Sequence, residues 1–192
     1  EIVRGGGVRE VRFETTDSKS LETSIPFLKA NNLDYSEILP IDDPAVKKIV
    51  GVTLFIMMTV VVVMLLSNGV NLTDGVDGLA SGSSAIVGVV LGILAYVSSH
   101  HDMAGYLNTM FIPGAEELVI FAATLVGATA GFLWYNSYPA QVFMGDTGSL
   151  ALGGIIGVFA ILIRKELLLP ILCGIFIAEF TSSFIQRFYF KY

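Results

Sequence analysis

IVGVTLFIMMTVVVVMLL, at residues 49–66, is a run of eighteen residues without a charged side chain. A helix needs about 20 largely apolar residues to cross a hydrocarbon layer of about 30 Å. Four further apolar stretches follow, at residues 79–97, 118–135, 150–163 and 167–184. Because helices satisfy their own backbone hydrogen bonds in lipid, the sequence predicts an all-α polytopic membrane protein with about five transmembrane helices in this chain.

The composition of the 192 residues agrees with a membrane protein: 54% are apolar, 15% are charged, and the mean hydropathy is +0.73. The net charge of −6 is not accompanied by a basic stripe, so we expect no nucleic acid partner. Cys173 is the only cysteine, which excludes an intrachain disulfide. The chain begins at Glu1 without a leader segment, and we interpret it as a fragment of a longer polypeptide.

The chain divides into two parts of different composition. We expect residues 1–46 to form an extramembrane insert or linker, outside the bilayer on the side opposite the active-site face, and residues 47–192 to form the transmembrane helical core. Within the first part, the pattern at residues 8–13 predicts a short strand and that at residues 21–28 a short amphipathic helix. The charged residues 164–166 predict a tight turn, which would make the last two spans an antiparallel hairpin.

Two polar motifs follow odd-numbered spans and therefore lie on one side of the bilayer. They are NLTDGVDGLASG, residues 71–82, after the first span, and YNSYPAQVFMGDTGS, residues 135–149, after the third. Two other polar groups, Asp42-Asp43 and His100-His101-Asp102, lie across the membrane from these motifs, and we interpret them as solvated loop residues.

The first motif combines acidic residues with glycines. Asn71, Asp74 and Asp77 are spaced by three, so a helical turn would align them on one face, while Gly75 and Gly78 permit tight bends and the close approach of a ligand. Ionisable groups at membrane depth are costly and are functional candidates. The alternative is an Asp-Gly turn that only caps the next helix.

The second motif adds a third carboxylate, Asp146, just before the fourth span. Carboxylate oxygens suit Mg²⁺, which takes one or two of them together with waters and substrate phosphates. The first backbone amides of the following helix, with Ser149, would favour an anion there. The alternative is that Asp146 only caps that helix.

NLTDGVDGLASG together with FMGDTGSLALGG, residues 143–154, resembles the phospho-N-acetylmuramoyl-pentapeptide-transferase family, within the polyprenyl-phosphate N-acetylhexosamine-1-phosphate transferases. The resemblance covers about residues 47–192, the part that would then be a partial transferase core. It implies Mg²⁺-dependent transfer of phospho-MurNAc-pentapeptide from UDP-MurNAc-pentapeptide to undecaprenyl phosphate, giving lipid I and UMP in peptidoglycan biosynthesis. It also implies a multi-pass protein of the bacterial inner membrane, in contact with membrane lipid. A homodimer is a further expected partner state.

The resemblance assigns roles to individual residues. Phe143 would stack on the uracil base, for which the alternative is an aromatic side chain at the lipid interface. Independently of the resemblance, Gln186 lies towards the motif side of the last span and would line the substrate groove. We therefore expect catalytic roles for Asn71, Asp74 and Asp146, with Asp146 as the Mg²⁺ ligand, and substrate-binding roles for Gly75, Asp77, Asn136, Phe143, Ser149 and Gln186.

The chain departs from the family in two places, since it has neither the adjacent Asp-Asp pair on an earlier helix nor the triple-histidine loop after the last span. We therefore expect these 192 residues alone to lack turnover. Three rival functions stay open: a related GlcNAc-1-phosphate transferase, a cation-coupled transporter, and an assembly subunit without catalytic activity. The count of basic residues beside the spans would place the motifs outside the cell, whereas the resemblance implies the cytoplasmic side.

Overall fold

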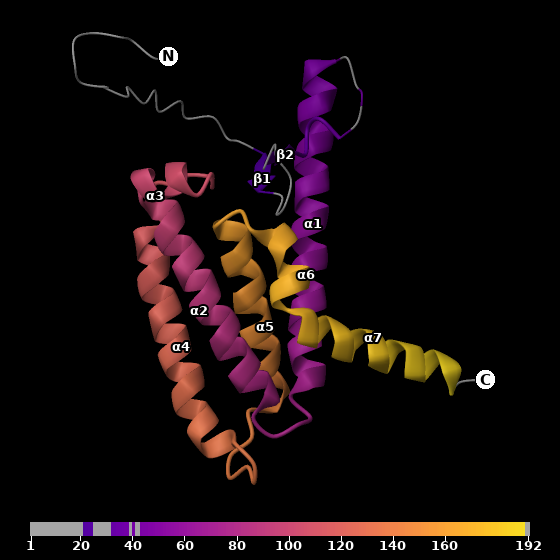
Figure 1. Cartoon of the computed structure of the whole chain (residues 1–192). Coiled ribbons are helices and arrows are strands. Elements are labelled where there is room, and N and C mark those ends of the chain that lie inside the picture. The colour runs from indigo at the N-terminus through magenta and orange to yellow at the C-terminus, as the bar shows by residue number, and fades with distance from the viewer. Residues whose placement is uncertain (1–20, 25–31, 39, 41–42, 191–192) are drawn as a thin grey trace.

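The computed structural model describes residues 21–24, 32–38, 40 and 43–190, and most of them are helical. Figure 1 shows a bundle of long helices with a small hairpin beside one end. The elements in chain order are β1 (Glu22–Ser24), β2 (Asn32–Asp34), α1 (Pro44–Thr73), α2 (Leu79–Ser99), α3 (His101–Tyr106), α4 (Glu116–Asn136), α5 (Gly145–Leu162), the 3₁₀ turn η1 (Glu166–Leu168), α6 (Leu169–Leu172) and α7 (Gly174–Tyr189).

Four of the described helices, α1, α2, α4 and α5, are long and apolar enough to cross a membrane. They correspond to the first four predicted spans, which confirms the all-α polytopic class. Only 11% of the most apolar window of α1, and the same share in α4, is buried inside the bundle. The exposed apolar side chains of these two helices therefore face lipid or other helices.

The fifth predicted span is not one straight helix. The chain reverses at residues 164–166 as expected, but α6 ends at Leu172 and α7 runs at 75° to the segment before it. Figure 1 shows α7 leaving the bundle sideways. Phe176 is 1% exposed and packs against Gly69 of α1, where a Cβ would lie 3.1 Å from the Phe176 carbonyl oxygen. Because Phe176 anchors the start of α7 on α1, and Gly174 weakens helix continuity, the helix direction changes there.

The bundle is built from two antiparallel pairs, α1 with α5 and α2 with α4, and α5 also contacts α2. The α1–α5 contact is very close at Gly153, where a Cβ would meet the Leu66 carbonyl oxygen and lie 2.7 Å from Ser67 Cα. In the same contact the Ser67 hydroxyl donates to the Leu150 carbonyl oxygen at 2.8 Å. Small residues at such a crossing allow the helix backbones to approach one another.

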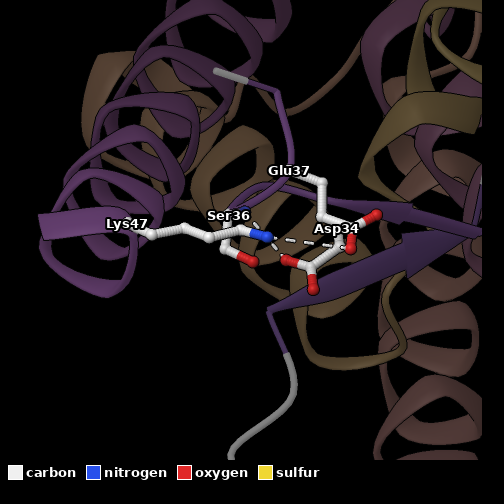
Figure 2. Close-up of polar contacts among 4 residues, drawn as sticks. All are labelled: Asp34, Ser36, Glu37 and Lys47. Carbon is white, nitrogen blue, oxygen red and sulfur yellow. Dashed lines mark hydrogen bonds and ion pairs between the residues drawn. The ribbon is translucent and has the colours of Figure 1, made fainter. Parts of the chain in front are cut away.

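The short strands form an antiparallel hairpin in which Thr23 pairs with Leu33. The expected amphipathic helix is therefore wrong at residues 22–24, and the strand expected at residues 8–13 lies outside the described residues. Figure 2 shows polar contacts between the end of the hairpin and α1: the Ser36 backbone amide donates to Asp34 Oδ1 at 2.8 Å, and Lys47 Nζ of α1 lies 3.8 Å from Glu37 Oε1. This ion pair is exposed and contributes little to stability.

The hairpin is held on the turn between α5 and α6 by buried polar contacts. The Arg164 carbonyl oxygen accepts from the Ser24 backbone amide at 3.2 Å and from the Thr23 hydroxyl at 3.3 Å. Lys165, 5% exposed, donates from Nζ to the Ser24 hydroxyl at 2.8 Å, and burial lowers the pKa of this ammonium. The charged turn predicted from the sequence is thus an interface and not a solvated loop.

Tyr35 completes this interface. Its hydroxyl donates to Glu166 Oε1 at 3.2 Å, and Oε2 of this 2%-exposed carboxylate has no hydrogen-bond partner among the described residues. Burial and the charge of Glu166 raise the pKa of the Tyr35 phenol well above its usual value, so the phenol stays a donor. The Tyr35 ring also meets Phe55 of α1 edge to face, with ring centroids 5.6 Å apart.

We expect Gly153→Ala to destabilise the bundle by about 1–3 kcal/mol, because a methyl group has no space against the backbone of α1. Gly154→Ala is the matched control, since a Cβ there meets nothing within 4 Å, and the gain in helix propensity reaches about 1 kcal/mol. Melting temperatures in detergent measure both. Equal melting temperatures for the two variants would contradict the close α1–α5 contact.

We expect Tyr35→Phe to weaken the attachment of the hairpin by about 1–3 kcal/mol, because the buried Glu166 carboxylate loses its hydrogen bond. Faster amide hydrogen exchange at residues 22–24 and 32–34 would report this loosening. Lys47→Ala, which removes only the exposed ion pair with Glu37, should leave exchange nearly unchanged. Exchange unaltered by Tyr35→Phe, or raised as much by Lys47→Ala, would show that the Tyr35–Glu166 contact does not hold the hairpin.

Candidate active site at one end of the bundle

The α1–α2 and α4–α5 connections, which carry the two polar motifs, lie side by side at one end of the bundle (Figure 1). The hairpin and α3 lie at the other end. Residues that are 75 positions apart in the sequence meet here, since Asn71 contacts Asp146 directly. The antiparallel packing of α1 on α5 produces this meeting, because it places the end of one helix beside the start of the other.

Asn71 lies in the last turn of α1 and links it to the first turn of α5. Its Nδ2 donates to Asp146 Oδ1 at 3.2 Å and to the Ser149 hydroxyl at 2.9 Å. Ser149 is fully buried, and its hydroxyl in turn donates to the Gly145 or Asp146 carbonyl oxygen, at 3.2 and 3.3 Å. Asp146 itself is exposed. The Ser149 side chain, expected to contact substrate, therefore faces Asn71, whereas the Asp146 side chain is exposed and open to a ligand.

Asp74 is the first residue after α1, and its backbone amide closes that helix by donating to the Val70 and Asn71 carbonyl oxygens. Its side chain is half-buried. Burial, and secondly the negative charge of Asp146, raise the pKa of the Asp74 carboxyl above its usual value. Two carboxylates from different motifs therefore share one electrostatic environment, and a cation between them would relieve their repulsion.

The helix does not continue as far as Asp77, so the expected common face of Asn71, Asp74 and Asp77 does not form. Gly78 has φ of +74°, a conformation that glycine adopts readily, and it starts α2. Asp77 lies in the turn before it and accepts from the Ala140 backbone amide at 3.1 Å. Asp77 thus fastens the first motif to the loop of the second, at residues 137–144.

Asn136, the last residue of α4, makes a second link between the same segments. Its Oδ1 accepts from the Gly78 amide at 3.1 Å and from the Ser81 hydroxyl at 3.0 Å, and its Nδ2 donates to the Val142 carbonyl oxygen at 2.9 Å. Asn136 is 3% exposed. The Asn136 side chain was expected to contact substrate, and in the structure both its oxygen and its nitrogen are hydrogen-bonded within the protein.

The other expected substrate contacts lie in different surroundings. Phe143 is 71% exposed, at the end of the loop before α5. Gly75 is exposed beside Asp74, and a Cβ there would meet only the Leu72 carbonyl oxygen, at 3.8 Å. Gln186 lies on α7, which points away from the bundle, and its side chain contacts Ser182 of the same helix at 3.2 Å. Gly75 thus follows Asp74 directly and leaves open space beside it, whereas the described contact of Gln186 is within α7, away from Asp74 and Asp146.

The acidic side chains of the two motifs do not cap the helices that follow them, which was the alternative interpretation of both motifs. The N-cap of α2 is Gly78 and that of α5 is Met144, and neither helix has a side-chain cap hydrogen bond. Asp43 does cap a helix, because its carboxylate accepts from the Ala45 amide at 2.9 Å at the start of α1. This cap and the His100-His101-Asp102 segment lie at the hairpin end, as expected from topology, but His101 and Asp102 belong to α3 and not to a loop. Asp42 lies outside the described residues.

The site fits a small divalent cation completed by substrate. Among the described residues no group of three or more His, Cys, Asp or Glu side chains forms a complete metal site. Asp146 and Asp74 supply two carboxylates, and Mg²⁺ binds with one or two of them when phosphate oxygens and waters supply the remaining ligands. Such a site suits a phosphate-bearing substrate.

Sequence reasoning missed the residues that support this site. Ser81 and Val142 hold Asn136, and both are unremarkable by type. In the sequence, Ser81 is a small polar residue at the start of an apolar helix. This pattern predicts contact between helices as readily as support of a site.

The fold and the site define a polytopic membrane protein with an acidic, phosphate-compatible site at one end of its helices. The chain matches the family described as glycosyl transferase family 4 over residues 23–164 and belongs to that family.

Curated relatives align along the whole chain. Proteins named phospho-N-acetylmuramoyl-pentapeptide-transferase are 64% identical over 191 residues in Porphyromonas gingivalis W83, 60% over 192 residues in Parabacteroides distasonis and 57% over 191 residues in Bacteroides thetaiotaomicron. Each alignment covers 100% of this chain but 45–46% of the relative, so the chain spans slightly less than half the length of these proteins.

We expect Asn136→Ala to destabilise the chain by about 1–3 kcal/mol, because it leaves the Gly78 amide, the Ser81 hydroxyl and the Val142 carbonyl without their buried partner. Thermal melting and protease sensitivity at residues 137–144 measure the effect. Asn68→Ala is the control, since that amide is exposed and its hydrogen bond among the described residues is to Met64 within α1. Its free energy of unfolding should change by no more than about 0.5 kcal/mol. Unchanged melting and protease resistance of Asn136→Ala would contradict the supporting role.

Proposed function

We propose that the full-length protein transfers phospho-MurNAc-pentapeptide from UDP-MurNAc-pentapeptide to undecaprenyl phosphate, forming lipid I and UMP. The observation that carries the proposal is the contact of Asn71 with Asp146, beside Asp74, at one end of the membrane helices. A membrane-embedded lipid phosphate and a soluble nucleotide can meet at such a place. The names of the relatives support the same reaction.

The proposed chemistry is a direct phosphoryl transfer. An oxygen of the lipid phosphate forms a bond to the phosphorus that carries the sugar, and the bond from that phosphorus to the bridging oxygen breaks, so that UMP leaves with the electron pair. Both reactants are anions, so neutralisation and in-line positioning are the main requirements. Asp74 as a nucleophile would require an additional covalent step, and we favour direct attack.

Mg²⁺ is the cofactor that we propose for this site, with Asp146 as its protein ligand and Asp74 beside it. When bound, the ion would neutralise pyrophosphate charge and orient the leaving group. Asn71 holds one oxygen of Asp146 by its hydrogen bond, and the backbone amides at the start of α5 favour a phosphate oxygen nearby.

The α4–α5 loop is the part that we propose for the uridine end. Phe143 is exposed there and offers a ring for stacking on the base. Asp77 and Asn136 fasten this loop to the first motif, so they shape the uridine end through the loop. Gly75 permits close approach beside Asp74. A role of Gln186 in substrate binding remains a prediction, because its described contact is to its own helix.

We propose that the motif end faces the cytoplasm of a bacterial inner membrane, where nucleotide-linked substrates are made, and that residues 1–46 lie on the opposite side. The proposed partners are the two substrates, membrane lipid and a second copy of the protein in a homodimer. We also propose that these 192 residues have no turnover by themselves, because they do not contain the adjacent Asp-Asp pair on an earlier helix and the triple-histidine loop of the resembled family.

We expect Asp146→Asn in the full-length protein to lower the rate of UMP release about 100- to 1000-fold, as is typical when one preorganised electrostatic contact is lost. Asparagine is a weaker Mg²⁺ ligand than aspartate, which explains the lost activity. Because asparagine keeps the volume of the side chain, the melting temperature should change little. Asp102→Asn, an exposed change at the hairpin end, is the control and should keep wild-type turnover. Near-normal turnover by Asp146→Asn at low Mg²⁺ would contradict the assignment.

The same preparation separates the proposed reaction from its rivals. UMP release should require UDP-MurNAc-pentapeptide and undecaprenyl phosphate together. Release from UDP-GlcNAc instead would identify the related GlcNAc-1-phosphate transferase. Ion flux in proteoliposomes without UMP release would favour the transporter, whose carboxylates are expected near the bilayer midplane and not at helix ends.

A further inference from the structure

The contact of α1 with α5 fixes which residues face each other at the site. Ser67 donates to Leu150 of α5, and Gly153 admits the backbone of α1 one turn further on. Asn71 lies one turn after Ser67 and therefore faces the preceding turn of α5, which carries Asp146 and Ser149. The three side chains form one hydrogen-bonded group that joins two helices.

Ser149 cannot meet a substrate from its position, because it is fully buried. Its hydroxyl hydrogen is used within α5, on the Gly145 or Asp146 carbonyl oxygen, so its oxygen is left to accept from Asn71 at 2.9 Å. A buried serine that accepts from a side-chain amide determines how that amide is turned.

The orientation of the Asn71 amide matters to Asp146. The amide nitrogen carries two hydrogens, and the structure directs one to Ser149 and the other to Asp146 Oδ1 at 3.2 Å. An ionised carboxylate only accepts hydrogen bonds, so an amide turned the other way would present its oxygen to Asp146 and repel it. Ser149 thus favours the one orientation that holds the Asp146 carboxylate in place.

We propose that Ser149 is a positioning residue, which acts through Asn71 to orient the Asp146 carboxylate toward a divalent cation. Asn71 occupies Oδ1 of Asp146 and leaves Oδ2 for the ion. Residues that hold a metal ligand in this way commonly change metal affinity or activity 10- to 100-fold when they are removed. The activity readout of this proposal rests on the proposed function, whereas its binding readout does not.

The test is Mn²⁺ binding to the full-length protein in detergent, measured by electron paramagnetic resonance without substrate. Ser149→Ala should weaken Mn²⁺ binding about 10-fold and raise the Mg²⁺ requirement of UMP release by a similar factor. Ser67→Ala is the matched control, because it also removes a hydroxyl from the α1–α5 contact but one turn away from the site. It should bind Mn²⁺ within about twofold of wild type, because Gly153 still lets the backbones of α1 and α5 meet in the same register and the hydrogen bonds among Asn71, Ser149 and Asp146 are kept.

A double-mutant comparison shows whether the effect passes through Asn71. In an Asn71→Ala background, Ser149→Ala should weaken Mn²⁺ binding by less than about twofold more, because residues in one hydrogen-bonded group are not additive. Melting temperatures identify any variant that fails to fold. Ser149→Thr, which keeps the hydroxyl group, should bind Mn²⁺ more tightly than Ser149→Ala wherever its melting temperature shows that it folds.

Three results would overturn the proposal. They are wild-type Mn²⁺ affinity in Ser149→Ala, an equal loss of Mn²⁺ affinity in Ser67→Ala, or a loss from Ser149→Ala that is just as large in the Asn71→Ala background. A wild-type protein that binds Mn²⁺ but releases no UMP would refute the proposed function alone, and the binding results would still decide the role of Ser149.

Discussion

The close contact between the backbones of α1 and α5 is the constraint on which the site depends. Gly153 has no side chain to separate the helices, and the Ser67 hydroxyl bonds to α5 within the same contact. The antiparallel register that results places Asn71 opposite Asp146, although the two residues are far apart in the sequence. A change of one turn in this register would separate the two acidic motifs.

The opposite end of α5 is held just as specifically, by different chemistry. There the hairpin of β1 and β2, with Tyr35 after it, bonds to the buried turn after α5, through the Arg164 carbonyl, Lys165 and Glu166. Buried polar groups are costly unless they are paired, so this interface fixes one arrangement of hairpin and helix. The helix that carries Asp146 is therefore fastened at both ends, which suits an exposed carboxylate that must keep one position.

Hydropathy and parity predicted much of this arrangement, because apolar length determines which segments span a membrane and the number of crossings determines their side. The same reasoning did not predict the 75° bend in the fifth span, because hydropathy does not show that Phe176 packs on Gly69 and turns α7 away. The meeting of the two motifs was predictable from topology. The buried positions of Asn136 and Ser149 were not, since burial depends on which helix faces which, and residue type does not encode that.

The most direct test of the account is an experimental structure of the full-length protein with Mg²⁺ and UDP, obtained by electron cryomicroscopy in lipid. We expect a cation in contact with the Asp146 carboxylate, with the Asn71 amide on the other oxygen of that carboxylate and Asp74 beside the ion. A cation bound away from Asp146, or Asn71 and Asp146 separated from one another, would contradict the claim that the two motifs build one site.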